Sequence, residues 1–320
     1  MKLSRRTLVA AAAMSLSMSF AAGSAKAQDF INILTGGTAG AYYPIGVALS
    51  NIYSKEIAGS RVQVQPTKAS VENLNLLNTR KGELALTLGD TLSNAWKGDA
   101  EMGFPQKLSS LRVLAAAYNN YIQIVASGSS GIKTLADMKG KRISVGAPKS
   151  GTEINARAVL GAAGLKYEDF AKVEYLGFGE SVDLMKNRQI DVTLQSAGLG
   201  VASIRDLANS IDIVIVPVPA DVVKKIGDPA YLVETIPAGT YKGQDAAVPA
   251  AAVGNYFVTT DKVSNDLAYK MTKAMVEGLD SLYAAHSAAK GIVKAKMGAN
   301  PPVPLHPGAE KYYKEAGLLK

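Results

Sequence analysis

Strand-like and helix-like patterns alternate along the chain from about residue 28 onward. Phe30–Leu34 and Glu83–Leu88 are short, mainly apolar runs with the length of buried strands, and Arg61–Gln65 alternates apolar with polar positions. Residues 70–79 place their apolar side chains on one face at helical spacing, and glycine-rich turns separate the segments. This alternation predicts an α/β fold with a mostly parallel sheet.

The same alternation restarts after residue 120 and continues to about residue 250. Its strands and helices are expected at 142–145, 150–163, 173–176, 181–187, 190–194, 201–208 and 211–216. A strand at 253–259, a long helical segment at 265–289, a proline-rich arm and a last helix follow. The sequence therefore predicts two α/β units of similar plan, at 28–120 and 121–250, followed by a mainly helical tail.

The first 27 residues have the organisation of an export signal. A basic start is followed by an apolar run at residues 8–22 and by an A-x-A cleavage site at residues 25–27. The adjacent Arg5 and Arg6 fit a twin-arginine signal and an ordinary Sec signal equally well. We expect cleavage before Gln28, export across the inner membrane and a periplasmic location.

The basic charge at first suggests nucleic acid or a membrane surface as the partner. The chain has 35 Lys and Arg against 27 Asp and Glu, a net charge of +8. Residues 1–27 carry four of these cations and no acidic residue, so cleavage lowers the net charge to +4. No later apolar run approaches the roughly 18–20 residues of a membrane span. We therefore expect a soluble mature protein, a monomer, that does not bind nucleic acid.

The residue types needed for most catalytic and metal sites are scarce. The chain has no cysteine, which excludes disulfides, thiolate metal sites and cysteine nucleophiles, and it has two histidines, His286 and His306. The sequence contains no G-x-S-x-G, no H-E-x-x-H and no EF-hand loop. We therefore predict a protein that is not an enzyme and that carries no cofactor or metal ion.

Three expected helix starts carry the strongest local signals. The first is the glycine-rich turn at residues 35–43, which has neither P-loop nor dinucleotide-binding spacing. The second begins at Ser70, and the third begins at Ser150, which forms the S-x-x-E pattern of a capping box with Glu153. The free N–H groups of a first helical turn favour an anion, although each start also fits an ordinary turn or cap.

A lysine precedes each of the last two helix starts. Lys68 and Lys149 lie where the helix dipole favours an anion, so each cation needs another reason, either a bound anion or simple exposure. Together with the glycine-rich turn, these lysines indicate a cleft for carboxylate or phosphate groups.

At these same positions the sequence resembles the TAXI family, the substrate-binding proteins of tripartite ATP-independent periplasmic (TRAP) transporters. The resemblance covers essentially all of the mature chain in order. It rests on Thr35-Gly36-Gly37-Thr38 with Tyr42-Tyr43-Pro44, Ser70-Val71-Glu72-Asn73-Leu74, Gly82-Glu83-Leu84-Ala85-Leu86 leading to Asp90, Ser144-Val145-Gly146 with Ser150-Gly151-Thr152-Glu153, Tyr175-Leu176-Gly177-Phe178, Gln189-Ile190-Asp191, Ile236-Pro237-Ala238-Gly239-Thr240-Tyr241, and Val303-Pro304-Leu305-His306-Pro307-Gly308.

The resemblance implies a two-lobed type II periplasmic-binding-protein fold with a ligand cleft between the lobes and hinge strands near 117–125 and 251–258. Residues 28–120 and about 251–320 would form one lobe, and residues 121–250 the other. Characterised members of the family are associated with glutamate, glutamine and 2-oxoglutarate. The family's conserved positions map onto Gly37, Thr38, Tyr42, Ser70, Asp90, Ser150, Gly151 and Thr152.

The chain departs from the family pattern at the predicted cleft. Lys68-Ala69 stands where the family usually has Gly-Gly, and Lys149 stands where it usually has a small residue. The two added cations favour a ligand with more negative charge than a neutral amino acid. Gln195, at the expected end of a strand, and Tyr42 would be specificity contacts.

The sequence-based prediction is therefore a periplasmic protein that captures a small organic anion, a dicarboxylate or an acidic amino acid such as glutamate or 2-oxoglutarate. It would deliver this anion to the membrane subunits of a TRAP transporter. Two alternatives stay open from the residues, a two-lobed transferase or lyase acting on an anionic metabolite and a ligand-sensing interaction protein.

Overall fold

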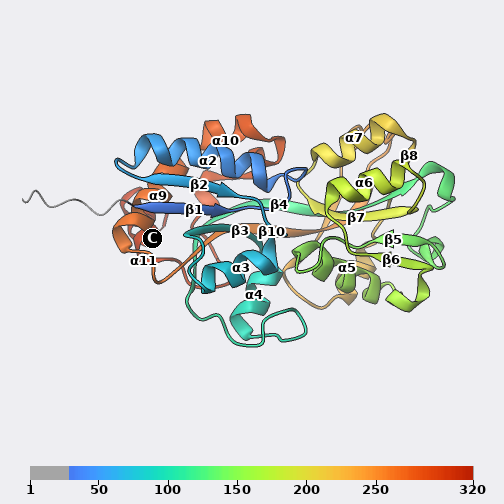
Figure 1. Ribbon diagram of the computed structural model, residues 1–320, viewed down its shortest axis with the longest axis horizontal. Coiled ribbons are helices and arrows are strands. Elements are labelled where there is room, and N and C mark those ends of the chain that lie inside the picture. The colour runs from blue at the N-terminus through green and yellow to red at the C-terminus, as the bar shows by residue number, and fades with distance from the viewer. Residues whose placement is uncertain (1–28, 320) are drawn as a thin grey trace, which may run out of the picture.

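The computed structural model describes residues 29–319, which fold into two lobes that lie side by side (Figure 1). The expected export signal at residues 1–27 lies outside the described residues. Four apolar clusters form the core, two lying mainly in each lobe, and the chain has the two-lobed α/β fold that the resemblance implies.

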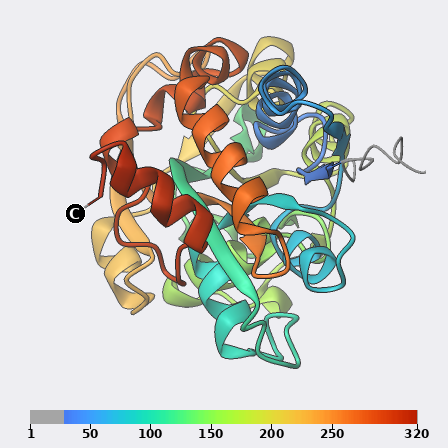
Figure 2. The same cartoon turned by 90° about the vertical axis from the view of Figure 1, so that its left-hand side faces the viewer.

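The first lobe contains three parallel strands covered by helices on both faces. Its elements are β1 (Phe30–Leu34), β2 (Arg61–Gln65), β3 (Leu84–Leu88), α2 (Tyr42–Glu56), α3 (Ser70–Asn78), α4 (Gly89–Lys97), α9 (Asn265–Glu277), α10 (Leu279–Ala285) and α11 (Pro307–Glu315). In the turned view, α9 and α11 cross the end of this lobe near the C-terminus (Figure 2).

The second lobe repeats the plan. Its parallel strands β5, β7 and β6 carry α5 on one side and α6 with α7 on the other (Figure 1). Its elements are β5 (Arg142–Ser144), α5 (Gly151–Ala162), β6 (Lys172–Glu174), α6 (Phe178–Lys186), β7 (Val192–Ala197), α7 (Ala202–Ser210), β8 (Ile213–Val216), α8 (Ala220–Lys225) and β9 (Tyr231–Ile236).

Two long strands join the lobes. β4 (Leu111–Ser127) and β10 (Val248–Thr260) pair with one another and run antiparallel to their neighbours, giving the order β2-β1-β3-β10-β4-β7-β5-β6. β8 also pairs with β4, and β9 with β10. The prediction of a mostly parallel sheet therefore holds within each lobe, whereas the strands between the lobes are antiparallel.

Several elements differ from the sequence expectation. In the sequence, residues 118–121 interrupt the β-rich pattern of residues 111–126, but β4 continues through them because Asn119 and Asn120 pair with β10. Helices α4 and α8 and strand β9 were not expected, and α6 begins at Phe178 rather than Ser181. Strand β9 and the earlier start of α6 place additional residues between the lobes.

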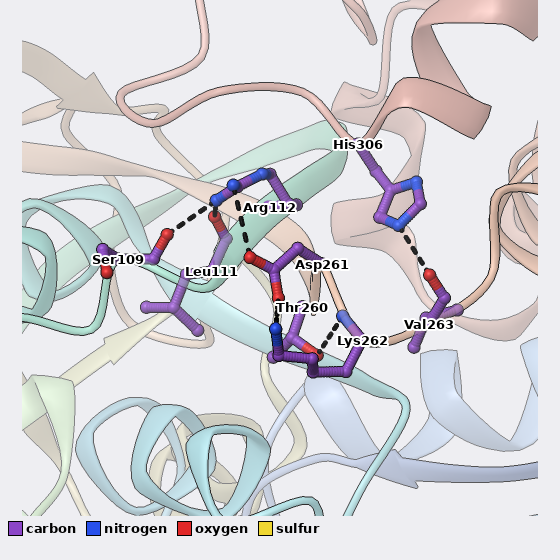
Figure 3. Close-up of polar contacts among 8 residues, drawn as sticks. All are labelled: Ser109, Leu111, Arg112, Thr260, Asp261, Lys262, Val263 and His306. Atoms are coloured by element: carbon purple, nitrogen blue, oxygen red, sulfur yellow. Dashed lines mark hydrogen bonds and ion pairs between the residues drawn. The ribbon is translucent and has the colours of Figure 1, made fainter.

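Both histidines act as local caps rather than as parts of a catalytic group. The imidazole Nδ1 of His306 accepts a hydrogen bond from the N–H of Gly308 at the start of α11, and Nε2 lies 3.0 Å from the carbonyl oxygen of Val263 (Figure 3). His286 accepts from the N–H of Ala288 in the same way. Burial lowers the pKa of both imidazoles, in keeping with neutral structural residues.

Within residues 29–319, no helix has the length and apolar character that a membrane crossing requires. The same residues contain no group of histidine and carboxylate side chains placed to hold a metal ion.

Candidate ligand-binding cavity

A cavity of about 690 Å³ lies between the lobes, where the carboxyl ends of six strands meet. Such ends are the usual ligand sites of open α/β sheets. The cavity is lined by Gly36, Gly37, Thr38, Ala39, Gly40, Ala41, Tyr42, Thr67, Lys68, Ala69, Ser70, Leu88, Asn120, Ala147, Pro148, Ser150, Gly151, Thr152, Tyr175, Leu176, Gly177, Phe178, Gly179, Glu180, Ser196 and Ala197.

Four helices begin at this cavity: α2, α3, α5 and α6. Among residues 29–319, no acceptor is found for the first N–H groups of α3, at Ser70 and Val71, or of α5, at Gly151 and Thr152. Each helix has at least nine residues, so each contributes a substantial positive dipole end. The cavity is therefore positive in potential before any side-chain charge is counted.

The second predicted helix start differs in detail from the expectation. Ser70 is the first residue of α3 rather than its cap, and its hydroxyl oxygen accepts from the N–H of Leu88 at 3.2 Å. Glu72 turns back and accepts from the N–H of Lys68, so part of this helix start is already capped by a carboxylate.

The third predicted helix start has the expected cap. The hydroxyl oxygen of Ser150 accepts from the N–H of Glu153 at 3.2 Å, as a helix cap does. The Glu153 carboxylate does not return to Ser150, because it pairs with Arg157 at 2.6 Å and accepts from the Tyr167 hydroxyl at 3.1 Å. The cap is therefore one-sided, and the N–H groups of the first turn face the cavity.

The backbone at two of the departures from the family pattern has a conformation that favours glycine. Ala69 has φ 73° and ψ −146°, and Lys149 has φ 62°. Non-glycine residues in such regions cost roughly 1–3 kcal/mol, and the strain clusters at functional sites. Both strained residues directly precede a serine that lines the cavity.

We expect Ala69→Gly to raise the free energy of unfolding by roughly 1 kcal/mol, because glycine relieves the strain but adds entropy to the unfolded chain. Urea unfolding monitored by circular dichroism measures the change. Ala48→Gly, inside α2, is the control and should lower stability by about 1 kcal/mol. Equal destabilisation by both variants would contradict the strain at Ala69.

Eight of the eleven predicted ligand-binding residues line this cavity: Gly37, Thr38, Tyr42, Lys68, Ser70, Ser150, Gly151 and Thr152. Asp90, Lys149 and Gln195 do not line it. The geometry thus brings together the three predicted helix starts and separates three side chains from them.

The side chain of Lys149 is exposed, and the residue contacts the other lobe through its backbone carbonyl rather than through its ammonium group. Its carbonyl oxygen accepts from the N–H of Glu72 at 3.2 Å, because the left-handed turn directs that carbonyl toward α3. Lys68 is also exposed but lines the cavity. Of the two lysines expected at the cleft, one is therefore placed to attract a ligand.

Gln195 was expected at the end of a strand, but it lies inside β7, which continues to Ala197. Its side chain is fully buried, and its amide oxygen accepts from the hydroxyl of Ser203 in α7 at 2.6 Å. Successive strand residues face opposite sides of a sheet. The next residue, Ser196, therefore lines the cavity in its place.

Asp90 was expected at a strand end facing the ligand, but it lies in the first turn of α4 and is buried beneath the cavity. Its carboxylate accepts from the N–H of Thr91 at 2.6 Å, from the Asn155 amide at 2.7 Å and from the Tyr231 hydroxyl at 2.8 Å. Burial raises the pKa of Asp90 to about 6, although these hydrogen bonds oppose the rise.

This carboxylate ends a chain of hydrogen bonds that crosses both lobes. Tyr42 donates to Asn255, whose amide donates to Asn120, and Asn120 donates to the carbonyl of Ser196. The hydroxyl of Ser196 then donates to Asn155, the partner of Asp90. The floor of the cavity is thus one polar network that links α2 and α4 of the first lobe to α5 and β7 of the second.

Sequence reasoning did not single out several lining residues. Phe178 was named only as part of a family motif and Glu180 not at all, because α6 was expected to begin at Ser181. A carboxylate three residues after Gly177 is a capping signal that could have located the start of this helix. Asn120 lies where residues 118–121 interrupt the β-rich sequence pattern. Its role depends on pairing between β4 and β10, which has no local signal in the sequence.

The lobes touch on both sides of the cavity. On one side, a Cβ built on Gly151 would lie 2.7 Å from the Ser70 hydroxyl and 2.7 Å from Leu88 of the other lobe. On the other side, a Cβ built on Gly40 would lie 3.7 Å from the Phe178 ring. The cavity is therefore bounded by both lobes.

A family model that spans residues 33–317 matches this chain. The chain belongs to the NMT1-like family. Solved structures similar to this member include PhnD1 from Prochlorococcus marinus in complex with methylphosphonate (TM-score 0.58, 10% identity, 91% of this chain and 100% of that one). Another, from Bordetella bronchiseptica, has TM-score 0.56 and 16% identity and covers 90% of this chain and 98% of that one.

A third similar structure is the ligand-binding component of an ABC-type import system from Staphylococcus aureus, solved with zinc bound (TM-score 0.52, 12% identity, 91% of this chain and 93% of that one). At these identities the likeness establishes the fold alone, which is that of the two-lobed periplasmic binding proteins.

Proposed function

We propose that this NMT1-like protein is a periplasmic substrate-binding protein that captures a small organic anion and delivers it to a TRAP transporter permease. The observation that carries the proposal is the convergence of four helix N-termini, with unpaired N–H groups on α3 and α5, on one cavity between two lobes. A single lysine, Lys68, adds positive charge at its rim.

The TRAP assignment rests on the resemblance of the sequence to the TAXI family. Four of the motifs that carry it, at residues 35–44, 70–74, 150–153 and 175–178, contribute residues to the cavity lining. The similarity to a binding component of an ABC-type importer makes an ABC permease the alternative partner.

The two alternative functions, a transferase or lyase and an interaction protein, fit the cavity less well than a binding protein does. A transferase or lyase needs a general acid or base at the ligand, and the ionisable side chains among the lining residues are Lys68, Glu180, Tyr42 and Tyr175. Burial raises the pKa of Tyr42 well above its usual value, and Glu180 accepts from the N–H of Gly177 at 3.0 Å. An interaction protein would not need a cavity of this size between its lobes.

Native mass spectrometry of the purified protein, followed by a thermal-shift screen of carboxylates and phosphonates, tests the binding role. We expect an organic anion to raise the melting temperature, since a ligand that binds only the folded state stabilises it by mass action. Stabilisation by neutral sugars or cations, and not by any anion, would contradict the proposal. The mature mass should correspond to a chain that begins at Gln28.

Uptake into proteoliposomes tests the transport partner. With a TRAP permease from the same genome, the protein should support uptake of the captured anion driven by an ion gradient in the absence of ATP. Uptake that requires ATP and an ABC permease would replace the TRAP assignment but keep the binding role.

We expect Lys68→Ala and Lys149→Ala to differ, although both remove one exposed cation next to a helix start. Lys68→Ala should weaken binding of the anion about 3- to 10-fold and flatten its dependence on ionic strength, because a cation at the cavity attracts the ligand through a screened field. Lys149→Ala should change neither. Calorimetric titration at low and moderate salt measures both, and equal losses in the two variants would mean that the charge acts at long range.

A further inference from the structure

The charges that line the cavity match one ligand carboxylate rather than two. Among the lining residues, all within the described chain, Lys68 is the cation and Glu180 the anion. Lys149, the second cation expected from the sequence, is not among them. A dicarboxylate would therefore bring two negative charges to a cavity whose side chains sum to zero.

Glu180 also occupies one of the four helix starts at the cavity. Its carboxylate accepts from the N–H of Gly177 at the beginning of α6 and so offsets the positive end of that helix. Near the starts of α3 and α5, Glu72 accepts from the N–H of Lys68 and Glu153 is paired with Arg157, and neither carboxylate lines the cavity. The starts of α3 and α5 thus keep first-turn N–H groups that have no acceptor among residues 29–319.

The wall next to Glu180 is apolar. Tyr175, Leu176 and Phe178 line it, and Phe178 is half-buried against the glycine-rich turn of the other lobe. Tyr175 is 42% exposed and is held in place by an edge-to-face contact with Tyr167, their ring centroids 6.2 Å apart. Leu88 and Pro148 add apolar surface.

The size of the cavity agrees with a ligand that carries an apolar group, its body, in addition to a carboxylate. About 690 Å³ lies within the range of roughly 300–1,000 Å³ that is typical of pockets for drug-sized molecules. A compact dicarboxylate would leave the aromatic wall in contact with water. An apolar body against that wall would remove both surfaces from water.

We propose that the ligand is an organic monoanion with an aromatic or branched aliphatic body, rather than a compact dicarboxylate or acidic amino acid. Its carboxylate binds at Ser70, Gly151 and Thr152 near Lys68, and its body packs against Phe178 and Tyr175. This inference rests on the proposed function and narrows it, because both concern the same cavity.

A matched set of 2-oxo acids tests the inference by calorimetric titration. 2-Oxoglutarate and 4-methyl-2-oxopentanoate share the same 2-oxo acid head, but one ends in a carboxylate and the other in an isopropyl group; phenylpyruvate adds an aromatic body. We expect 4-methyl-2-oxopentanoate or phenylpyruvate to bind at least 10-fold more tightly than 2-oxoglutarate or glutamate.

The variant Phe178→Ala should weaken binding of the apolar monoanion about 10-fold, while Phe178→Leu should retain most of it. Phe30→Ala, a change at an exposed phenylalanine outside the cavity, is the control for general effects. Tighter or equal binding of the dicarboxylates, or no response to Phe178→Ala, would overturn the inference and leave the proposed function intact. If none of these anions nor any other in the screen binds, the proposed function itself fails.

Discussion

Replacing Gly151 by alanine or valine should weaken ligand binding by roughly 10- to 100-fold without unfolding the protein. A Cβ at this position would lie 2.7 Å from the Ser70 hydroxyl, 2.7 Å from Leu88 Cδ1 and 3.0 Å from Ser70 Cβ, all across the interface between the lobes. Overpacking of this kind costs about 1–3 kcal/mol. Because the contact joins α5 of one lobe to α3 and β3 of the other, we expect the cost to fall mainly on the approach of the lobes.

The measurement is calorimetric titration with the anion that stabilises the wild-type protein most, combined with small-angle X-ray scattering. The variants should show a larger radius of gyration than the wild type, with valine exceeding alanine. Gly161→Ala is the matched control, since Gly161 lies on the same helix and a Cβ there meets no other atom within 4 Å. Unchanged affinity in both glycine variants would show that ligand binding does not require this contact.

The buried carboxylate of Asp90 should make the stability of the protein fall as pH rises from about 4 to about 6. Burial raises the pKa of Asp90 from 3.8 to about 6, so the folded state holds a proton that the unfolded chain has already lost across that window. Below the window both states are protonated, and above it both are ionised. The free energy of unfolding should therefore drop by at most about 3 kcal/mol through the window and then level off.

Asp90→Asn removes this titration. As pH rises from 4 to 7, the unfolding free energy of the wild type should therefore fall relative to that of the variant. Urea unfolding at several pH values measures the shift, and Asp183→Asn, at an exposed carboxylate on α6, is the control. Tyr231→Phe removes one donor to the carboxylate and should extend the drop to higher pH. Parallel curves for wild type and Asp90→Asn would contradict the raised pKa.

Much of the local structure could be predicted from the sequence because local patterns determine it. The apolar runs gave β1 and β3, the alternating Arg61–Gln65 gave β2, and helical spacing gave α3 nearly to the residue. Ser150 caps α5 as its S-x-x-E pattern indicates. Such features depend on side-chain periodicity and on hydrogen bonds over three or four residues, which a sequence displays directly.

The candidate site was predictable where it consists of helix starts and was not where it depends on register. Ser70, Ser150 and Gly151 follow strand-to-helix turns, and such turns gather at the carboxyl edge of a sheet whatever the details of packing. Gln195 and Ser196 show the opposite case. Since β7 extends past its expected end, alternation turns Gln195 into the lobe and Ser196 into the cavity.

The sequence by itself determined the two α/β units, the helix starts that surround the ligand site, and the scarcity of catalytic and metal-binding residues. Only the tertiary structure decided how the lobes meet. The contacts between the lobes bury Asp90, which accepts hydrogen bonds from the other lobe. They also leave Lys68 but not Lys149 at the cavity and place Phe178 in the cavity wall. Contacts between segments far apart in the chain determine these three outcomes, and no local pattern records them.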